Sequence, residues 1–194
     1  MKNPYAIGEL VYLRPLEPED AQVVAHWFND PDVSRTLRMW RPMTVVGEAE
    51  FLTKLGKSEG DVILGVTTVE GDRLIGSVGL HGFEIKNRSG CFGVLIGEKR
   101  EWGKGYGGEA TRLMVDVGFG TINLHRIWLE VFAENERGIR AYEKAGFRRE
   151  GLMRRSEYRE GCWHDSVLMA ILRDEWEIRP HKPAKRATAG RRSA

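Results

Sequence analysis

A glycine-rich segment at residues 100–110 is the feature that most constrains the fold of this 194-residue chain. It reads Arg-Glu-Trp-Gly-Lys-Gly-Tyr-Gly-Gly-Glu-Ala and follows a short apolar run, typical of a strand, at 91–96. Apolar residues then recur with helical spacing at positions 110, 113, 114 and 117. The four glycines allow positive φ and a close approach of ligand, and the free N–H groups of a helix N-terminus favour an anion. The segment predicts a strand, an anion-binding loop and a helix.

Two other phosphate-binding loops fit this segment less well. A Walker A loop needs Gly-Lys-Ser or Gly-Lys-Thr, whereas Lys104 is followed by Gly105. The dinucleotide pattern G-x-G-x-x-G is matched by Gly103, Gly105 and Gly108. A Rossmann domain carries that pattern after its first strand, but here it lies mid-chain with roughly eighty residues after it. The context argues against a nicotinamide cofactor.

A second motif accompanies the glycine loop at 135–147, Asn-Glu-Arg-Gly-Ile-Arg-Ala-Tyr-Glu-Lys-Ala-Gly-Phe. Together with the pattern R-x-x-G-x-G in the loop, it resembles the GNAT superfamily of acetyl-CoA-dependent N-acetyltransferases. Three further segments resemble the RimJ/RimL-like branch of that superfamily: 11–20, 27–32 and 161–176. That branch is similar to enzymes that acetylate N-terminal amines of ribosomal proteins, and its relatives also include polyamine, antibiotic and amino-acid acetyltransferases.

The resemblance implies an α+β chain with the GNAT fold, a mixed, mostly antiparallel seven-stranded sheet flanked by about four helices. It also implies that the strands at 89–96 and 126–132 splay apart and hold acetyl-CoA between them. The residue pattern predicts strands near 11–15, 62–69, 74–80, 89–96, 126–132, 147–158 and 163–172. It predicts helices at 18–28 and 45–55, after the glycine loop, and between a cap at Asn135 and a stop at Gly146.

The composition, 41% apolar and 30% charged, suits a single domain, which we place at residues 1–179. No apolar stretch has the length of a membrane span and the N-terminus lacks a signal-peptide pattern, so we expect a cytoplasmic protein without membrane contact. Cys91 and Cys162 lack C-x-x-C spacing, and the five histidines lack ligand spacing. We therefore expect two reduced thiols and no metal.

Residues 180–194 carry five Lys or Arg and no acid, against 25 basic and 28 acidic residues in the rest of the chain. The Pro, Ala, Gly and Ser content of this tail buries too little apolar surface for folding, so we expect it to be disordered. A basic tail suits a weak ribosome or nucleic-acid contact through phosphates, or simply a solvated terminus. The solvated terminus is the simpler interpretation.

Binding of acetyl-CoA, which the resemblance implies, requires contacts to its pyrophosphate. Backbone N–H groups of the glycine loop meet this need, and Arg100 and Lys104 add charge. The predicted binding positions in the loop are Trp102, Gly103, Lys104, Gly105, Tyr106, Gly107 and Gly108. The resemblance places the strand N–H groups that face the developing oxyanion at Val94, Leu95 and Ile96. Asn135, besides capping its helix, is a candidate to bind the pantetheine arm.

Acetyl transfer from acetyl-CoA to an ammonium also needs a base and an acid. Strand alternation places Glu130 on one face with Trp128 and Phe132, whose rings would desolvate its carboxylate. Glu130 matches a catalytic glutamate of some relatives, whereas others use water relays, and a rim glutamate is the structural alternative. Tyr142 matches the tyrosine that protonates the coenzyme A thiolate in much of the superfamily. A core tyrosine with a satisfied hydroxyl is the alternative.

The acceptor site is expected near the N-terminal helices, where Arg35, Arg38 and Arg41 lie within seven residues, beside Trp40. Such a cluster repels a polyamine and attracts a carboxylate, a phosphate or an acidic peptide, unless the loop is merely solvated. Asp165 also matches the branch. It serves either to orient the substrate ammonium or to fix the turn between the last two strands.

These features predict an N-acetyltransferase in which a primary amine attacks acetyl-CoA directly in a ternary complex. A protein N-terminal amine is the favoured acceptor through the branch resemblance, ahead of antibiotic, polyamine and amino-acid substrates. A coenzyme-A-binding module without catalysis is the second class of function, and the presence of both Glu130 and Tyr142 weighs against it. A strand edge or the final hairpin offers a surface for a homodimer.

Overall fold

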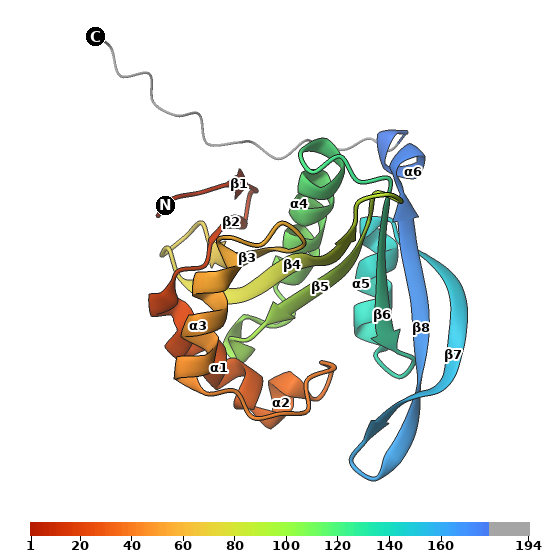
Figure 1. Cartoon of the computed structure of the whole chain (residues 1–194), viewed down its shortest axis with the longest axis horizontal. Coiled ribbons are helices and arrows are strands. Elements are labelled where there is room, and N and C mark those ends of the chain that lie inside the picture. Colours follow the sequence, from red (N-terminus) through yellow and green to blue (C-terminus); the bar gives the residue numbers. More distant parts are fainter. Residues whose placement is uncertain (179–194) are drawn as a thin grey trace.

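The computed structural model of the chain describes residues 1–178, so the predicted tail at 180–194 lies outside the described residues. These residues form one mixed sheet of eight strands, in the order β1-β2-β3-β4-β5-β6-β8-β7 (Figure 1). The strands are β1 (Ala6–Ile7), β2 (Val11–Pro15), β3 (Val62–Thr68), β4 (Leu74–Glu84), β5 (Ser89–Ile96), β6 (Arg126–Phe132), β7 (Arg148–Arg159) and β8 (Cys162–Leu172). The helices are η1 (Pro18–Asp20), α1 (Ala21–Asn29), α2 (Pro31–Ser34), α3 (Val45–Leu55), η2 (Lys99–Glu101), α4 (Tyr106–Gly120), α5 (Glu136–Ala145) and α6 (Arg173–Glu177).

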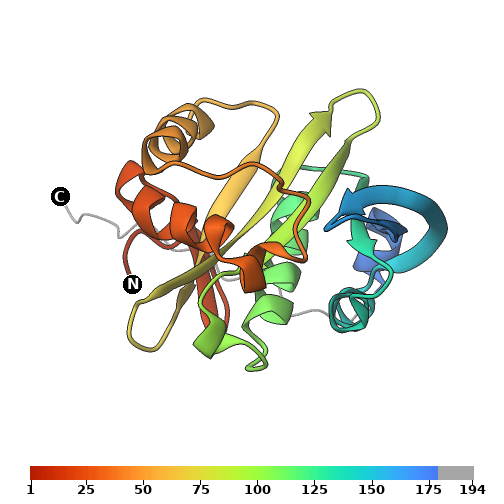
Figure 2. The same cartoon turned by 90° about the horizontal axis from the view of Figure 1, so that it is seen from below.

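Helices cover both faces of the sheet (Figure 2). On one face, Met114 of α4 and Ile139 of α5 belong to the main apolar core, together with side chains of the central strands. On the other face, α1 and α3 form a second core in which Trp27 and Leu52 share a cluster with Leu95 of β5. The central strands are therefore buried on both sides, and this fixes the position of β5.

The parallel pairing of β5 with β6 ends after three residue pairs. The last pair is Cys91 with Trp128, and the rest of each strand pairs only with its outer neighbour, β4 or β8. The two strands therefore splay apart toward their C-terminal ends. This confirms the predicted mixed, mostly antiparallel sheet with a splayed strand pair.

The structure adds elements that the sequence pattern did not indicate. The sheet has eight strands rather than seven, because β1 is a two-residue strand, too short to show alternation. Within residues 1–178, six α-helices and two 3-10 turns replace the expected four helices. The additional α2 is a single turn that begins with Pro31 and is capped by the Asp30 carboxylate, which accepts the N–H of Asp32 at 2.9 Å. The single domain at 1–179 stays a prediction.

The buried carboxylate of Glu109 ties the first turns of α4 to the N-terminal hairpin. Its oxygens accept the backbone N–H groups of Glu9, Leu10 and Val11 at 2.9, 2.7 and 2.8 Å. A glycine at position 8 permits this contact, since a Cβ at Gly8 would lie 2.7 Å from the carboxylate carbon. The contact fixes the start of α4, and with it the glycine loop.

We expect Glu109→Ala to lower the free energy of unfolding by about 3 kcal/mol, because it leaves three N–H groups without their acceptor. Urea denaturation followed by circular dichroism measures this loss. Glu136→Ala, which removes an exposed carboxylate from α5, is the matched control and should cost less than about 0.5 kcal/mol. Equal losses in the two variants would contradict the anchoring role of Glu109.

Candidate functional site

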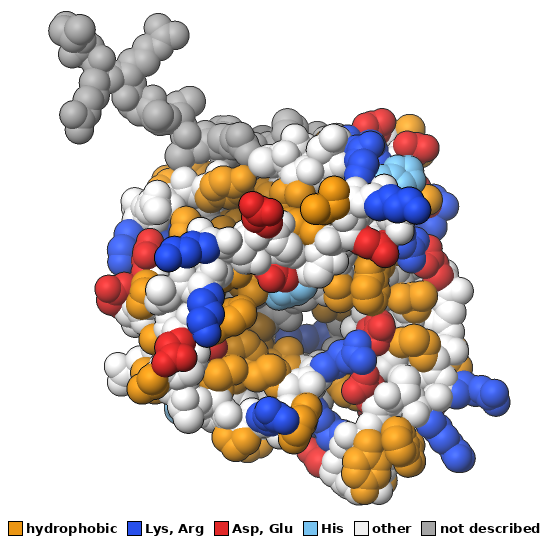
Figure 3. Space-filling view, in the orientation of Figure 1, with side chains coloured by type: hydrophobic (Ala, Val, Ile, Leu, Met, Phe, Trp, Pro, Cys, Tyr) orange, Lys and Arg blue, Asp and Glu red, His pale blue; other side chains and the backbone are white. Residues whose placement is uncertain are grey.

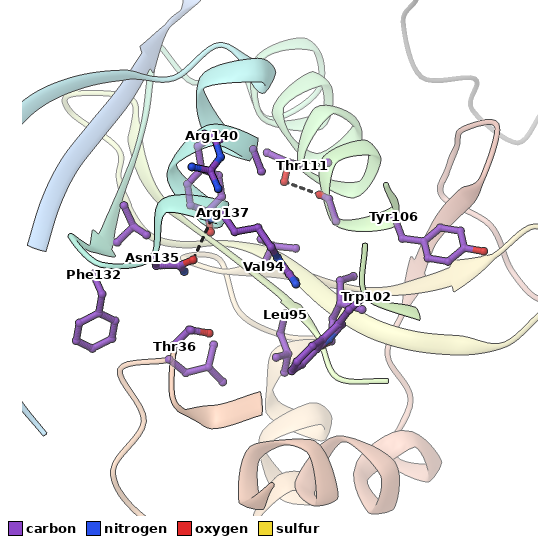
Figure 4. Close-up of a pocket in the computed structure, with 18 of the residues that line it drawn as sticks. Thr36, Val94, Leu95, Trp102, Tyr106, Thr111, Phe132, Asn135, Arg137 and Arg140 are labelled. Atoms are coloured by element: carbon purple, nitrogen blue, oxygen red, sulfur yellow. Dashed lines mark hydrogen bonds between the residues drawn. The ribbon is translucent and has the colours of Figure 1, made fainter. Parts of the chain in front are cut away.

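A cavity of about 1000 Å³ occupies the gap between β5 and β6. The space-filling view, in the orientation of Figure 1, shows a hollow near the centre of the molecule (Figure 3). We call the part lined by the glycine loop, α4 and α5 the cofactor half (Figure 4). The part lined by residues 32–37, the end of β6 and the turn between β7 and β8 is called the acceptor half.

The glycine loop presents backbone donors to the cofactor half. Gly103 and Gly105 adopt left-handed φ values of 80° and 89°, and Gly105 caps α4. A Cβ at Gly103 or Gly108 would meet nothing within 4 Å, so both positions face open space. The indole N–H of Trp102 donates to the carbonyl of Ile96 at 2.7 Å and holds the loop against the end of β5. The first N–H groups of α4 have no acceptor within the helix, which suits a pyrophosphate.

Most predicted cofactor residues meet at this cavity. Those that line it are Val94, Leu95, Ile96, Trp102, Gly103, Gly105, Tyr106, Gly107, Gly108, Asn135 and Tyr142. The two predicted cations lie elsewhere: Arg100 does not line the cavity, and Lys104 pairs with Glu101 at 2.9 Å.

Basic residues that sequence reasoning missed supply charge to the cofactor half. They are Arg112, Arg137, Arg140 and Lys144. The guanidinium of Arg137 lies over the ring of Trp102, 5.4 Å from its centroid (Figure 4). The last three share one face of α5 at i, i+3 and i+7, a spacing that would have revealed them. These cations, the open glycine positions and the free helix N–H groups together fit the polyanionic acetyl-CoA.

The ladder between β4 and β5 decides which N–H groups enter the gap. The N–H of Gly97 donates to Ile75 at 2.9 Å, and hydrogen-bonded pairs alternate along an antiparallel ladder. Leu95 therefore donates toward β4, whereas Val94 and Ile96 direct their N–H groups away from β4. The carbonyl of Ile96, which accepts the indole N–H of Trp102, also points away from β4. Of the three predicted oxyanion donors, two face the gap.

Tyr142 and Asn135 come to the cavity from α5 and its cap. The Tyr142 ring packs edge-on against Phe92 and Phe147, with centroids 6.0 and 5.9 Å away. Burial raises the pKa of Tyr142 to about 12, so the phenol stays protonated at physiological pH. The Asn135 side chain accepts the N–H of Gly138 at 2.9 Å and lines the cavity (Figure 4). Asn135 thus caps its helix, the Tyr142 ring packs against two phenylalanines, and both residues also line the cavity.

Glu130 lines the acceptor half and has a partner that the sequence did not indicate. Arg38, from the segment after α2, directs Nη1 to the Glu130 carboxylate. Its Nη2 lies 2.6 Å from the carboxylate of Glu157 on β7. Both carboxylate side chains are largely buried, with 15% and 18% of their surface exposed. The contact that the structure gives the Glu130 carboxylate is thus to a guanidinium, and its aromatic surroundings stay a prediction.

The predicted arginine cluster is divided among three environments. Arg35 lines the cavity, and Arg38 is held between two carboxylates. Arg41 stacks on Trp40, 4.4 Å from the ring centroid, and Trp40 is 80% exposed. Neither Trp40 nor Arg41 lines the cavity. The cluster is not a free positive patch facing the acceptor.

Arg159, which sequence reasoning did not select, joins β7 to the segment after α2. Its guanidinium donates to the carbonyls of Ser34, Leu37 and Met39 at 2.7, 2.6 and 2.7 Å. It also lies over the ring of Phe132, 5.6 Å from the centroid. No spacing in the sequence signals this contact, because its partners are backbone groups more than 100 residues away.

Two neighbouring residues of β8 lie in different settings. His164 lines the acceptor half, where its Nδ1 lies 2.6 Å from the carboxylate of Glu134. A histidine oriented by a carboxylate can carry protons. Asp165 is not among the residues that line the cavity, and its carboxylate accepts the N–H of Arg155 at 2.7 Å, where β7 is bulged. This contact is structural, but it lies at the bulge of β7 and not at the turn between the last two strands that was foreseen.

The cysteines show no sign of covalent chemistry. Cys91 and Cys162 are free thiols, and burial together with the Glu130 carboxylate raises the pKa of Cys91. Among residues 1–178, no group of three His, Cys, Asp or Glu side chains is arranged to hold a metal ion. In the same range, no helix has the length and apolar character needed to cross a membrane.

Comparisons with known proteins agree with this geometry. Residues 11–148 match the family described as an acetyltransferase (GNAT) domain. A probable N-acetyltransferase of Bacillus subtilis, YjcK, is 36% identical over 181 residues, which cover 88% of this chain and 98% of that protein. The spermidine N(1)-acetyltransferase of Escherichia coli is 29% identical over 174 residues, 89% of this chain and 90% of that protein. A crystal structure of spermidine N-acetyltransferase from Vibrio cholerae with CoA and spermine has a TM-score of 0.82 at 25% identity, and covers 88% and 99% of the two chains.

We expect the double variant Arg137→Gln, Arg140→Gln to weaken coenzyme A binding about tenfold, because it removes two cations from the wall of the cofactor half. Isothermal titration calorimetry with coenzyme A measures the dissociation constant. Arg100→Gln should leave that constant within about twofold, since the side chain lies outside the cavity. A larger effect of Arg100→Gln would place a phosphate against η2 instead of against α5.

Proposed function

We propose that this chain, which belongs to the GNAT acetyltransferase family and is an acetyl-CoA-dependent N-acetyltransferase, acetylates the primary amine of a small cationic molecule. Polyamines such as spermidine are the first class to test, because two of the similar proteins are spermidine acetyltransferases. This proposal replaces the protein N-terminal amine that the branch resemblance favoured. The proteins found to be similar include spermidine acetyltransferases, so the comparisons do not single out the RimJ/RimL-like branch.

One observation carries the proposal: carboxylates surround the acceptor half. Those that line it are Asp32, Glu130, Glu134 and Glu160, and Glu157 is joined to Glu130 through Arg38. Of the nearby arginines, Arg38 is paired with two carboxylates, Arg159 is bound to backbone carbonyls, and Arg35 lines the cavity without an ion pair among the described residues. The sequence argument against polyamines relied on three arginines. In the structure Arg38 is neutralised and Arg41 lies outside the cavity, so Arg35 alone of the three stands against the lining carboxylates. A cationic acceptor therefore meets a favourable field.

The proposed reaction is direct attack of the amine in a ternary complex. Acetyl-CoA supplies the activated acetyl group. Glu130 takes the proton of the acceptor ammonium, and the N–H groups of Val94 and Ile96 stabilise the negative charge that develops on the acetyl oxygen. Tyr142 donates its phenolic proton to the departing sulfur. The raised pKa of Tyr142 suits a donor, because the phenol is protonated before each turnover.

Self-association is also a proposal. The β7–β8 hairpin extends beyond the body of the molecule (Figure 1) and exposes Leu152, Tyr158 and Trp163. These side chains support the homodimer expected from the sequence. The ribosome or nucleic-acid contact expected of the tail falls outside the described residues, and a cytoplasmic location stays a prediction.

We expect Tyr142→Phe to lower kcat about 100-fold with little change in the Michaelis constant for acetyl-CoA, because only the proton donor is lost. Release of coenzyme A measures the rate. The protonated phenol is the active form and is lost only as pH rises through about 12, so Tyr142 should add no fall in kcat between pH 7 and 10. A variant with wild-type kcat would show that Tyr142 is only a packing residue.

The acceptor is identified by coenzyme A release with a panel of amines. The panel contains spermidine, peptides beginning with Ala or Ser, an aminoglycoside and free amino acids. We expect kcat/KM for spermidine to exceed that for the peptides at least about tenfold, because several ammonium groups meet the carboxylates. A preference for the peptides would restore the protein N-terminal amine as the acceptor.

A further inference from the structure

We propose that Glu130 and Glu157 together form the binding site for the acceptor ammonium, and that Arg38 occupies this site in the free enzyme until the acceptor displaces it. The inference rests on the proposed function and places recognition of the amine at the edge of the acceptor half, where Glu130 lines the cavity and Glu157 lies across Arg38 from it. It makes Glu157 and Arg38 specificity-determining residues.

The geometry is that of one cation between two fixed anions. Glu130 and Glu157 project from β6 and β7, which flank β8 in the sheet. The guanidinium of Arg38 reaches both, one nitrogen to each carboxylate. The carboxylates are largely buried, whereas 55% of the Arg38 side chain is exposed. Arg38 is therefore the member of the cluster that can leave for solvent.

Arg38 fills the site imperfectly. Oε1 of Glu157 is buried and has no aligned hydrogen-bond donor among the described residues, although Nη2 of Arg38 lies 2.6 Å away. A planar guanidinium directs its N–H groups in fixed directions, whereas an ammonium carries three donors that rotate about the C–N bond. A primary ammonium can thus satisfy both carboxylates where Arg38 does not.

A cation must occupy the site at all times. Two neighbouring carboxylates in a largely buried position repel each other, and an unpaired buried charge is costly. Exchange of the guanidinium for an ammonium keeps the charge balance, so the cost of removing Arg38 is offset by the incoming cation. A neutral or anionic compound cannot make this exchange and leaves Arg38 in place.

The segment that carries Arg38 stays anchored during the exchange. Arg159 binds the carbonyls of Ser34, Leu37 and Met39, on both sides of Arg38. Only the side chain of Arg38 needs to move, and Arg159 acts as a positioning residue that keeps the acceptor half covered.

The exchange also prepares the chemical step. With Arg38 displaced, the ammonium of the acceptor contacts Glu130 directly. An N–H bond of the ammonium breaks, its proton passes to the Glu130 carboxylate, and the freed electron pair attacks the acetyl carbon. When the C–S bond then breaks, Tyr142 gives its proton to the coenzyme A sulfur and takes the second proton from the attacking nitrogen. Glu157 retains its negative charge and holds the amine in place.

Steady-state kinetics with spermidine tests the site through matched variants. Arg38→Gln should lower the Michaelis constant for spermidine about three- to tenfold, because the amine no longer competes with a resident cation. Glu157→Gln should raise it at least about tenfold, because one of the two anions is lost. Both should leave the Michaelis constant for acetyl-CoA unchanged. Arg41→Gln, in the same segment but outside the cavity, is the control and should behave as wild type.

Nuclear magnetic resonance of the arginine guanidinium groups gives an independent readout in the wild-type enzyme. The Arg38 signal, identified by its loss in Arg38→Gln, should move toward that of free arginine when spermidine is added to the coenzyme A complex. An unchanged Arg38 signal while other cavity residues respond, or a raised Michaelis constant for spermidine in Arg38→Gln, would overturn the exchange and leave the proposed function standing. Absence of spermidine turnover in the wild type would overturn both.

Discussion

The early end of the pairing between β5 and β6 is the constraint on which the rest of this structure depends. A sheet that splits in its interior leaves two strands with unpaired backbone groups, and such groups require partners. Here the gap becomes the cavity, and the N–H groups of Val94 and Ile96 become donors to whatever enters it. The outer neighbours β4 and β8 continue their pairing and keep both edges rigid. A reactive oxygen placed in the gap therefore meets donors that are already oriented.

Charge divides this cavity into two unlike halves. The cofactor half combines a helix N-terminus with basic side chains from α4 and α5, whereas the acceptor half is lined by four carboxylates beside Arg35 and Arg159. On the proposed function, the anionic cofactor and the cationic acceptor bind at opposite ends of one cavity, with Tyr142 in the cofactor half and Glu130 in the acceptor half. The Glu109 contact supports this division, because it holds the start of α4 in place without presenting a free carboxylate to the phosphates.

Local patterns predicted those parts of the fold that short segments determine. The predictions match the structure for the strands at 89–96 and 126–132 and for the helix between Asn135 and Gly146. Strand alternation, the helix cap and the glycine with positive φ that ends the helix are all encoded in adjacent residues. The charge arrangement of the site could not be predicted in the same way. Arg38 and Glu130 are 92 positions apart, so the sequence shows three arginines in a loop and not the carboxylates that neutralise one of them. Asp165 illustrates the same limit. Its neighbour His164 lines the cavity, whereas Asp165, one residue further along β8, accepts a backbone N–H of β7.

The environment of Glu130 connects recognition with chemistry. A carboxylate that is to accept a proton from an ammonium must be shielded from water, yet a shielded carboxylate without a partner destabilises the fold. The intramolecular cation of Arg38 resolves this conflict, since it pairs the charge while the acceptor is absent and is exposed enough to withdraw. In the proposed exchange, selection for a cationic amine follows from the need to replace one positive charge by another. The shape of the cavity need only admit the molecule that carries that charge.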